Sequence, residues 1–321
     1  MKNSKVFMFS VFALLCVVFL FSGCTKKDAE NKNVKKIGIL QLVEHDALDA
    51  SYRGFVDGLA EAGFEDGKNI KIDYQNAQGE QANCQTIAQK LINDKDDLIL
   101  AIATPAAQAV ANLTKDIPVL VTAVTDPASA KLVKSNEVPG TNVSGTSDLT
   151  PVEAQINLIK KLVPNVKKIG FLYCSSEQNS YFQIDIAKKV CDELGIEYVD
   201  ATVSNTNEVQ QVTQNLVGKV DAIYAPTDNM IASSMATVAM VTIPAKLPVI
   251  CGEEGMTMAG GLATYGINYY ELGKQTAKQA VKILNGEAEP ATMPIEYLET
   301  CSLTVNEDMA QKLGITIPDN L

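Results

Sequence analysis

Two kinds of side chain that often do chemistry are almost missing from this chain of 321 residues, which has one His, His45, and one Arg, Arg53. A metal site with several His ligands, or a pair of Arg around a phosphate, cannot be built from this inventory, and a His-based triad has a single candidate. No Gly-x-Ser-x-Gly turn, which carries the nucleophile of many hydrolases, occurs in the sequence. We therefore expect no metal, no cofactor and no enzymatic activity.

Acidic and amide side chains, in contrast, recur just after apolar stretches. Asp126, Asp228 and Glu253 each follow such a stretch within a few residues. A carboxylate in this position could accept charge-assisted hydrogen bonds from an ammonium group, and Asn76 and Asn229 could add directional bonds. The alternative for each acid is structural, as a turn residue or as the N-cap of the next helix.

The sequence Thr104-Pro105-Ala106-Ala107 predicts a helix start, with Thr104 as N-cap and Pro105 in the first turn. Free N–H groups and the helix dipole make such a start attractive to an anion, and small Ala side chains let a carboxylate come close. Ser175 and Ser176 are candidate partners for the same carboxylate. The alternative is a plain N-cap that binds no ligand.

Short apolar runs alternate with amphipathic segments and would position these residues. The expected strands in the first half are Ile37–Leu40, Ile70–Tyr74, Leu98–Ala103 and Val119–Ala123. The expected helices are Leu48–Ala62, which Gly63 ends, Gln81–Ile92 and Pro105–Leu113. Strands and helices in alternation favour a doubly wound α/β fold, a parallel sheet with helices on both faces.

The order of elements then restarts. Lys35-Lys36-Ile37-Gly38-Ile39-Leu40 returns as Lys167-Lys168-Ile169-Gly170-Phe171-Leu172, and Ile117-Pro118-Val119-Leu120 is echoed by Leu247-Pro248-Val249-Ile250. Further pairs keep the same order, with offsets of about 120 to 132 residues. We infer two lobes of one design that face each other across a ligand cleft.

Ligands of open α/β sheets bind beyond the carboxyl ends of the strands, so the cleft residues should follow each strand. Gln41 follows the first expected strand, and His45 is expected at the cleft rim or in a loop rather than in contact with the ligand. The chain should cross between the lobes near Asn142–Ser147 and Tyr265–Asn268, where Gly145 and Gly266 could absorb a bend. The complete set of expected ligand-binding residues is Gln41, Asn76, Thr104, Pro105, Ala106, Ala107, Asp126, Asn142, Ser175, Ser176, Asp228, Asn229, Glu253, Tyr265 and Asn268.

The first residues have the pattern of a bacterial lipoprotein signal peptide. Lys2 and Lys5 precede an apolar run over residues 6–21, and Ser22-Gly23-Cys24 follows it. We expect cleavage after residue 23, attachment of a lipid to Cys24, and a polar tether over residues 24–36. Residues 37–145 with about 268–288 should form lobe one, and residues 146–267 with about 289–321 should form lobe two.

Charge and cysteine content limit the binding partners and the disulfides that we expect. The net charge of −11 argues against a nucleic-acid binder. Without Cys16 in the signal and Cys24 at the lipid, five Cys remain, at positions 84, 174, 191, 251 and 301. They lack C-x-x-C spacing, so we expect mostly buried thiols, with one disulfide as the alternative.

Several local strings resemble one family of binding proteins. They are Ile39-Leu40-Gln41, Asp73-Tyr74-Gln75-Asn76-Ala77, Ala101-Ile102-Ala103-Thr104-Pro105-Ala106-Ala107-Gln108 and Thr125-Asp126-Pro127. Together with the signal and the two lobes, they are similar to the ABC-transporter substrate-binding lipoproteins that include tryptophan/tyrosine-binding members in Gram-positive bacteria. The resemblance implies a type I periplasmic-binding-protein fold and a monomer on the outer face of the cytoplasmic membrane. It also implies delivery of a free amino acid to an ABC permease and its ATPase.

Other functions remain open from the sequence alone. A lipoprotein that senses a solute without serving an importer is one alternative. The ligand could instead be a nucleoside, a sugar or a branched-chain amino acid. A surface α/β enzyme built on a carboxylate pair such as Asp228 and Glu253 is the least favoured alternative.

Overall fold

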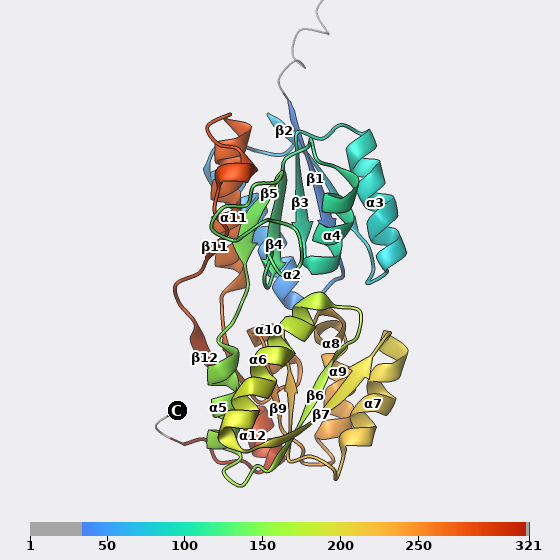
Figure 1. Cartoon of the computed structure of the whole chain (residues 1–321), viewed down its shortest axis with the longest axis vertical. Coiled ribbons are helices and arrows are strands. Elements are labelled where there is room, and N and C mark those ends of the chain that lie inside the picture. The colour runs from blue at the N-terminus through green and yellow to red at the C-terminus, as the bar shows by residue number, and fades with distance from the viewer. Residues whose placement is uncertain (1–33, 319–320) are drawn as a thin grey trace, which may run out of the picture. The chain divides into compact units, whose positions relative to one another are not determined.

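The computed structural model describes residues 34–318 and 321. These residues form two six-stranded sheets with equivalent strand orders, β11-β5-β4-β3-β1-β2 and β12-β10-β9-β8-β6-β7. Helices cover both sheets, and the two lobes that result are seen one above the other in Figure 1. The predicted doubly wound α/β fold in two similar lobes is confirmed, because β1 and β6, which carry the repeated Lys-Ile-Gly sequence, occupy the same place in their sheets.

Lobe one is formed by the first half of the chain and by a later segment, residues 269–297. Its strands are β1 (Lys35–Gln41), β2 (Ile70–Asn76), β3 (Leu98–Ile102), β4 (Val119–Val124), β5 (Val143–Ser147) and β11 (Glu296–Tyr297). Its helices are α2 (Asp46–Glu61), α3 (Gln81–Asn93), α4 (Thr104–Leu113), α11 (Tyr269–Leu284) and the 3-10 turn η2 (Pro290–Thr292).

Lobe two repeats the pattern with the rest of the chain. Its strands are β6 (Lys168–Cys174), β7 (Glu197–Val203), β8 (Ala222–Ala225), β9 (Val249–Cys251), β10 (Ala263–Gly266) and β12 (Ser302–Val305). Its helices are α5 (Val152–Leu162), α6 (Gln178–Leu194), η1 (Thr206–Glu208), α7 (Val209–Leu216), α8 (Asn229–Ser233), α9 (Met235–Thr242), α10 (Glu254–Ala259) and α12 (Glu307–Leu313).

Hydrophobic patterning explains these elements. Every residue of β3 and β4 is buried, as expected for central parallel strands that are covered on both faces. In α2, Leu48, Phe55 and Leu59 are buried at helical spacing while the opposite face is exposed. The core of each lobe therefore lies between its sheet and its helices.

Helices α2 and α11 pack closely against each other in lobe one. Three glycines make this approach possible. A Cβ on Gly54 would lie 2.0 Å from the carbonyl oxygen of Tyr270, and one on Gly273 would lie 2.1 Å from that of Ser51. Gly58 faces Ala277 in the same contact. The two helices thus touch backbone to backbone, which fixes α11 on the lobe.

The chain passes between the lobes three times, over residues 148–151, 267–268 and 298–301. The first crossing begins directly after the expected Asn142–Ser147, because residues 143–147 are strand β5 of the first sheet, and the second lies within the expected Tyr265–Asn268. Gly145 does not serve as a hinge there. Its φ of +143° and a Cβ position only 2.1 Å from the Val121 carbonyl oxygen show that it permits close pairing of β5 with β4.

The C-terminal segment also divides differently from the expectation. Residues 289–321 were expected in lobe two, but β11 pairs in parallel with β5 and extends the first sheet. Only from β12 onward does the chain join the second sheet, antiparallel to β10. A strand of two residues has no periodicity that a sequence pattern could reveal.

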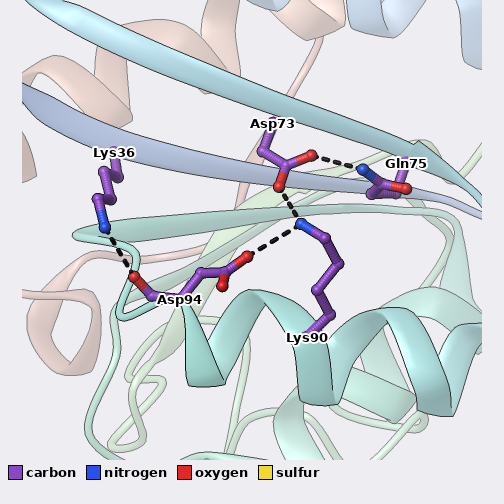
Figure 2. Close-up of polar contacts among 5 residues, drawn as sticks. All are labelled: Lys36, Asp73, Gln75, Lys90 and Asp94. Atoms are coloured by element: carbon purple, nitrogen blue, oxygen red, sulfur yellow. Dashed lines mark hydrogen bonds and ion pairs between the residues drawn. The ribbon is translucent and has the colours of Figure 1, made fainter.

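A charged cluster ties α3 to the edge of the first sheet (Figure 2). Lys90 of α3 forms ion pairs with Asp73 of β2 and, at 2.9 Å, with Asp94. Lys36 donates to the main-chain oxygen of Asp94 at 2.9 Å, and Gln75 donates to Asp73 at 2.5 Å. These side chains are largely exposed, so the cluster adds little stability.

The expected signal peptide, Cys24 and most of the tether fall outside the described residues. Within residues 34–318, no helix is both long and apolar enough to cross a membrane. All five Cys in this range are free thiols. Four are buried and Cys301 is exposed, so the expectation of mostly buried thiols is confirmed.

Candidate functional site

A cavity lies where the two lobes meet, beyond the carboxyl ends of strands from both sheets. It has a volume of about 10 Å³, room for about one water molecule. Lobe one and the first crossing contribute His45, Leu48, Ala123, Asp148 and Tyr269. Lobe two contributes Thr227, Asp228, Asn229, Ala232, Glu253 and Met256. The position agrees with the rule for open α/β sheets.

Asp148 is the most distinctive group in this cavity. It begins the first crossing and is buried. Tyr269, the first residue of α11, donates its hydroxyl to Oδ2 of Asp148 at 2.8 Å, whereas Oδ1 is buried without a hydrogen bond. Burial raises the pKa of Asp148 to about 6, although the Tyr269 hydrogen bond opposes this shift. A buried carboxylate with an unused oxygen is a strong acceptor for a cationic donor.

Glu253 is a second carboxylate in the cavity wall. It is the N-cap of α10, where its two oxygens accept the main-chain N–H groups of Gly255 and Met256 at 2.5 and 2.6 Å. Burial raises the pKa of Glu253 to about 7. Each oxygen keeps a lone pair, so the side chain can act as cap and as cation acceptor together.

Asp228 also lines the cavity, but both of its oxygens accept hydrogen bonds from other residues of lobe two. Oδ1 accepts the N–H of Ile231 at 2.9 Å as the N-cap of α8. Oδ2 accepts the N–H of Cys174 and the hydroxyl of Ser180, both at 2.6 Å. Burial raises the pKa of Asp228. This bonding is the structural alternative that the sequence had left open for Asp228.

Glu177 orients Asn229 from behind the cavity wall. The Oε2 of Glu177 accepts Nδ2 of Asn229 at 2.6 Å, and its Oε1 accepts the N–H of Met230 at 3.0 Å. The Oδ1 of Asn229 lies 3.3 Å from Nε2 of His45 in lobe one. Burial, with the nearby charge of Asp228, raises the pKa of Glu177.

Uncharged hydrogen bonds join the lobes deep in the interface. The hydroxyls of Thr125 in lobe one and Thr227 in lobe two lie 3.4 Å apart. Gln183 of α6 donates to Thr227 at 2.7 Å and to Thr125 at 3.5 Å. The lobes therefore contact each other directly at the back of the cavity.

A second set of uncharged contacts joins the lobes near the start of α6. Gln108 of α4 donates to Oε1 of Gln178 at 3.0 Å. Gln178 in turn donates to the carbonyl oxygen of Ser129 at 2.6 Å. With both sets of contacts formed, the lobes are in a closed arrangement.

Several residues expected at the ligand lie elsewhere. Asp126 accepts from the N–H of Ser129 and from Asn136, as a turn residue of lobe one. Asn142 donates to two main-chain oxygens at the start of β5, at the strand ends away from the cavity. Ser175 and Ser176 are exposed. These four residues do not line the cavity.

The remaining expected residues outside the cavity lining have local roles. Asn76 accepts the N–H of Gln78 in a turn, and Asn268 is the N-cap of α11. Tyr265 faces a surface groove beside α5. Gln41 is buried and donates to Asp49 at 2.7 Å, whereas its Oε1 has no partner.

The start of α4 differs in detail from the expectation. Ala103, with φ of +81°, is the N-cap, and Thr104 is the first helical residue rather than the cap. Thr104, Pro105, Ala106 and Ala107 are all buried. An Ala N-cap has no side chain to satisfy the first N–H groups, so this helix start keeps its attraction for an anion.

Two residues that the sequence reasoning missed, Asp148 and Gln183, complete the interface. Asp148 is the first charged residue after the polar strand β5, which is a weak signal in hindsight. Gln183 lies within the first turns of α6 and carries no such signal, whereas Glu177 closely follows strand β6, where the rule for cleft residues places it. The importance of Asp148 and Gln183 arises only from contacts across the fold.

Comparison with known proteins agrees with this architecture. Residues 36–321 match the family described as ABC transporter substrate binding protein. The tyrosine-binding protein of Clostridioides difficile (strain R20291) is 43% identical over 325 residues, covering 98% of this chain and 94% of that relative.

Two solved structures show related proteins in different states. The ABC domain from Streptococcus pneumonia in complex with L-Trp is 43% identical, covers 89% of this chain and 96% of its own, and superposes with a TM-score of 0.86. A ligand-free, open substrate-binding protein with adhesive properties from Clostridium difficile is 50% identical over 89% of this chain and 97% of its own, yet its TM-score is 0.68. The arrangement of the lobes here is therefore closer to that of the L-Trp complex. The family match and these relatives confirm the resemblance inferred from the sequence, and the chain belongs to the ABC transporter substrate binding protein family.

Proposed function

We propose that this substrate-binding protein captures an aromatic amino acid, tyrosine or tryptophan, between its lobes. The observation that carries the proposal is Asp148, which lines a cavity formed by both lobes and has one buried oxygen without a hydrogen bond. An α-ammonium group would satisfy this oxygen through a charge-assisted hydrogen bond, with Glu253 as a second acceptor. The relatives support an aromatic ligand, since one is named tyrosine-binding and another was solved with L-Trp.

The lobes would open to admit the ligand and close to bury it. The closed form brings Asp148, Glu253 and the apolar residues Leu48 and Met256 around one volume, which at about 10 Å³ must widen to hold an amino acid. A ligand that contacts both lobes binds the closed form more tightly and shifts the population toward it. The start of α4, where the first N–H groups have no side-chain cap, does not line this cavity, so a ligand carboxylate would reach it only if the space between the lobes widens on binding.

Binding can be measured directly because the chain contains no Trp. We expect a saturable change in the emission of added L-tryptophan, with one ligand per protein, and displacement of the tryptophan by L-tyrosine. Leucine, glucose and uridine serve as controls for the alternative ligand classes. The proposal fails if neither aromatic amino acid binds at millimolar concentration, or if one of the controls binds more tightly.

The proposal extends to transport from the outer face of the cytoplasmic membrane. Support comes from the family, which serves ABC transporters, and from the Ser22-Gly23-Cys24 sequence after an apolar run. A lipid on Cys24 would hold the protein beside its permease. Cys24→Ser should move the protein from the membrane fraction to the soluble fraction of expressing cells. Unchanged membrane association of this variant would argue against lipidation.

A further inference from the structure

The amide of Asn229 is held in one orientation. Its Nδ2 donates to Oε2 of Glu177 at 2.6 Å, and both oxygens of Glu177 also accept main-chain N–H groups, from Asn229 at 3.2 Å and Met230 at 3.0 Å. Oε2 also accepts from Nδ2 of Asn179 at 3.0 Å, so this oxygen meets the Asn229 amide as an acceptor, and a proton taken up by Glu177 is left to Oε1. The carbonyl oxygen of Asn229 is therefore the atom directed at His45.

This orientation determines which nitrogen of His45 carries a proton. Nε2 lies 3.3 Å from the Asn229 oxygen, so Nε2 must be the donor. Burial lowers the pKa of His45, although Asn229, Asp49 and Asp46 oppose the shift, and the ring is neutral at pH 7. Nδ1 then carries a lone pair. Within residues 34–318 this nitrogen makes no hydrogen bond, and the side chain does not cap α2.

His45 thus brings an acceptor to the cavity besides the two carboxylates. Leu48, Ala232 and Met256 give the same cavity apolar surface that a ring would contact once the space between the lobes has widened to admit the ligand. In the proposed complex, Asp148 and Glu253 already accept hydrogen bonds from the ammonium group of an amino acid. The acceptor that remains, Nδ1 of His45, fits a ligand whose ring carries a hydrogen-bond donor in addition to the ammonium group.

We propose that Nδ1 of His45 accepts a hydrogen bond from the ring donor of the ligand, the phenol O–H of tyrosine or the indole N–H of tryptophan. His45 is then the residue that selects these two amino acids over phenylalanine. The inference rests on the proposed function and adds the ligand group that is recognised. Phenylalanine would leave a desolvated acceptor unpaired, which costs more than the absence of one contact.

The test compares four ligands by isothermal titration calorimetry on the wild-type protein. L-Tyrosine and L-tryptophan are expected to bind at least about 10-fold more tightly than L-phenylalanine, and 1-methyl-L-tryptophan should lose a similar factor against L-tryptophan. His45→Leu should weaken tyrosine and tryptophan while leaving phenylalanine nearly unchanged, so that the preference falls to within about 3-fold.

Two further variants separate this role from a general loss of the site. Asp148→Asn should weaken tyrosine, tryptophan and phenylalanine by similar factors, because all three share the ammonium group. Tyr181→Phe, at an exposed position outside the cavity, should leave every affinity unchanged. Equal wild-type affinities for tyrosine and phenylalanine, together with equal affinities for tryptophan and its 1-methyl derivative, would overturn the role of His45 even if the variant does not fold. Absence of binding by all four ligands would instead refute the proposed function.

Discussion

Asp148→Asn is expected to weaken binding of tyrosine and tryptophan at pH 8 by roughly 30-fold to 1000-fold, about 2–4 kcal/mol. The substitution keeps the shape of the side chain and the hydrogen bond from Tyr269, but it removes the charge that pairs with the ammonium group. The loss is large because the carboxylate is buried and no solvent replaces it. Isothermal titration calorimetry with both ligands measures the effect.

The same substitution should stabilise the protein without ligand. A pKa of about 6 for Asp148 in the folded protein, against an ordinary value of 3.8, means that the folded state binds the proton more tightly than the unfolded state. Stability therefore falls as pH rises from about 4 to above 6, by up to roughly 3 kcal/mol. Asn carries no such cost, so the unfolding temperature of the variant should exceed that of wild type at pH 8 and approach it at pH 4.

Ligand affinity should respond to pH in the opposite direction. Below about pH 6 Asp148 takes up a proton and loses its attraction for ammonium, and Glu253, with a pKa of about 7, contributes in the same direction. Affinity is thus expected to drop between pH 8 and pH 5, and to drop less in Asp148→Asn. Asp126→Asn is the matched control, because this turn carboxylate lies outside the cavity and its loss should leave affinity unchanged. Full affinity in Asp148→Asn would place the ammonium site elsewhere.

Gly273→Ala is expected to be one of the most damaging single methyl additions in lobe one, together with alanine at Gly54 or Gly145. Its Cβ would lie 2.1 Å from the carbonyl oxygen of Ser51 and 2.9 Å from the nitrogen of Phe55, and backbone atoms cannot move aside as a flexible side chain can. We expect a loss of about 3 kcal/mol or more, although Ala is the better helix former. The unfolding temperature should fall by roughly 6 °C or more in a thermal melt.

Gly266→Ala is the matched control for this prediction. Gly266 also lies beside a crossing, but its nearest neighbours would be 3.5 Å from the new Cβ, an ordinary contact. The control should melt within about 2 °C of wild type. Equal melting temperatures for the two variants would show that α2 and α11 can separate at small cost, contrary to the packing described above.

Much of the fold could be predicted because local patterns agree with it. The repeated Lys-Ile-Gly sequences mark equivalent strands, and the apolar run from Leu98 to Ile102 is a fully buried strand. The sequence pattern predicted the wrong local structure at two positions, and at both of them tertiary contacts determine the structure. Gly145 looks like a hinge residue but permits close strand pairing, and β11 is too short to show periodicity.

The site was harder to predict than the fold. Asp228, Asn229 and Glu253 do line the cavity, because a residue just after a parallel strand must lie at the same edge of the sheet. The rule cannot tell whether an acid caps a helix, as Asp228 does, or keeps an oxygen free, as Asp148 does. That distinction depends on Tyr269, which follows Asp148 by 121 positions in the chain.

The contacts that join the lobes are all between uncharged groups, and this has a consequence for the medium in which the protein works. In residues 34–318, every ion pair forms within one lobe, whereas Gln108, Thr125, Gln178 and Gln183 connect the two through neutral hydrogen bonds. Dissolved salt screens charges but hardly affects short hydrogen bonds between neutral groups. These hydrogen bonds should therefore hold the lobes together almost equally well in dilute and in saline surroundings.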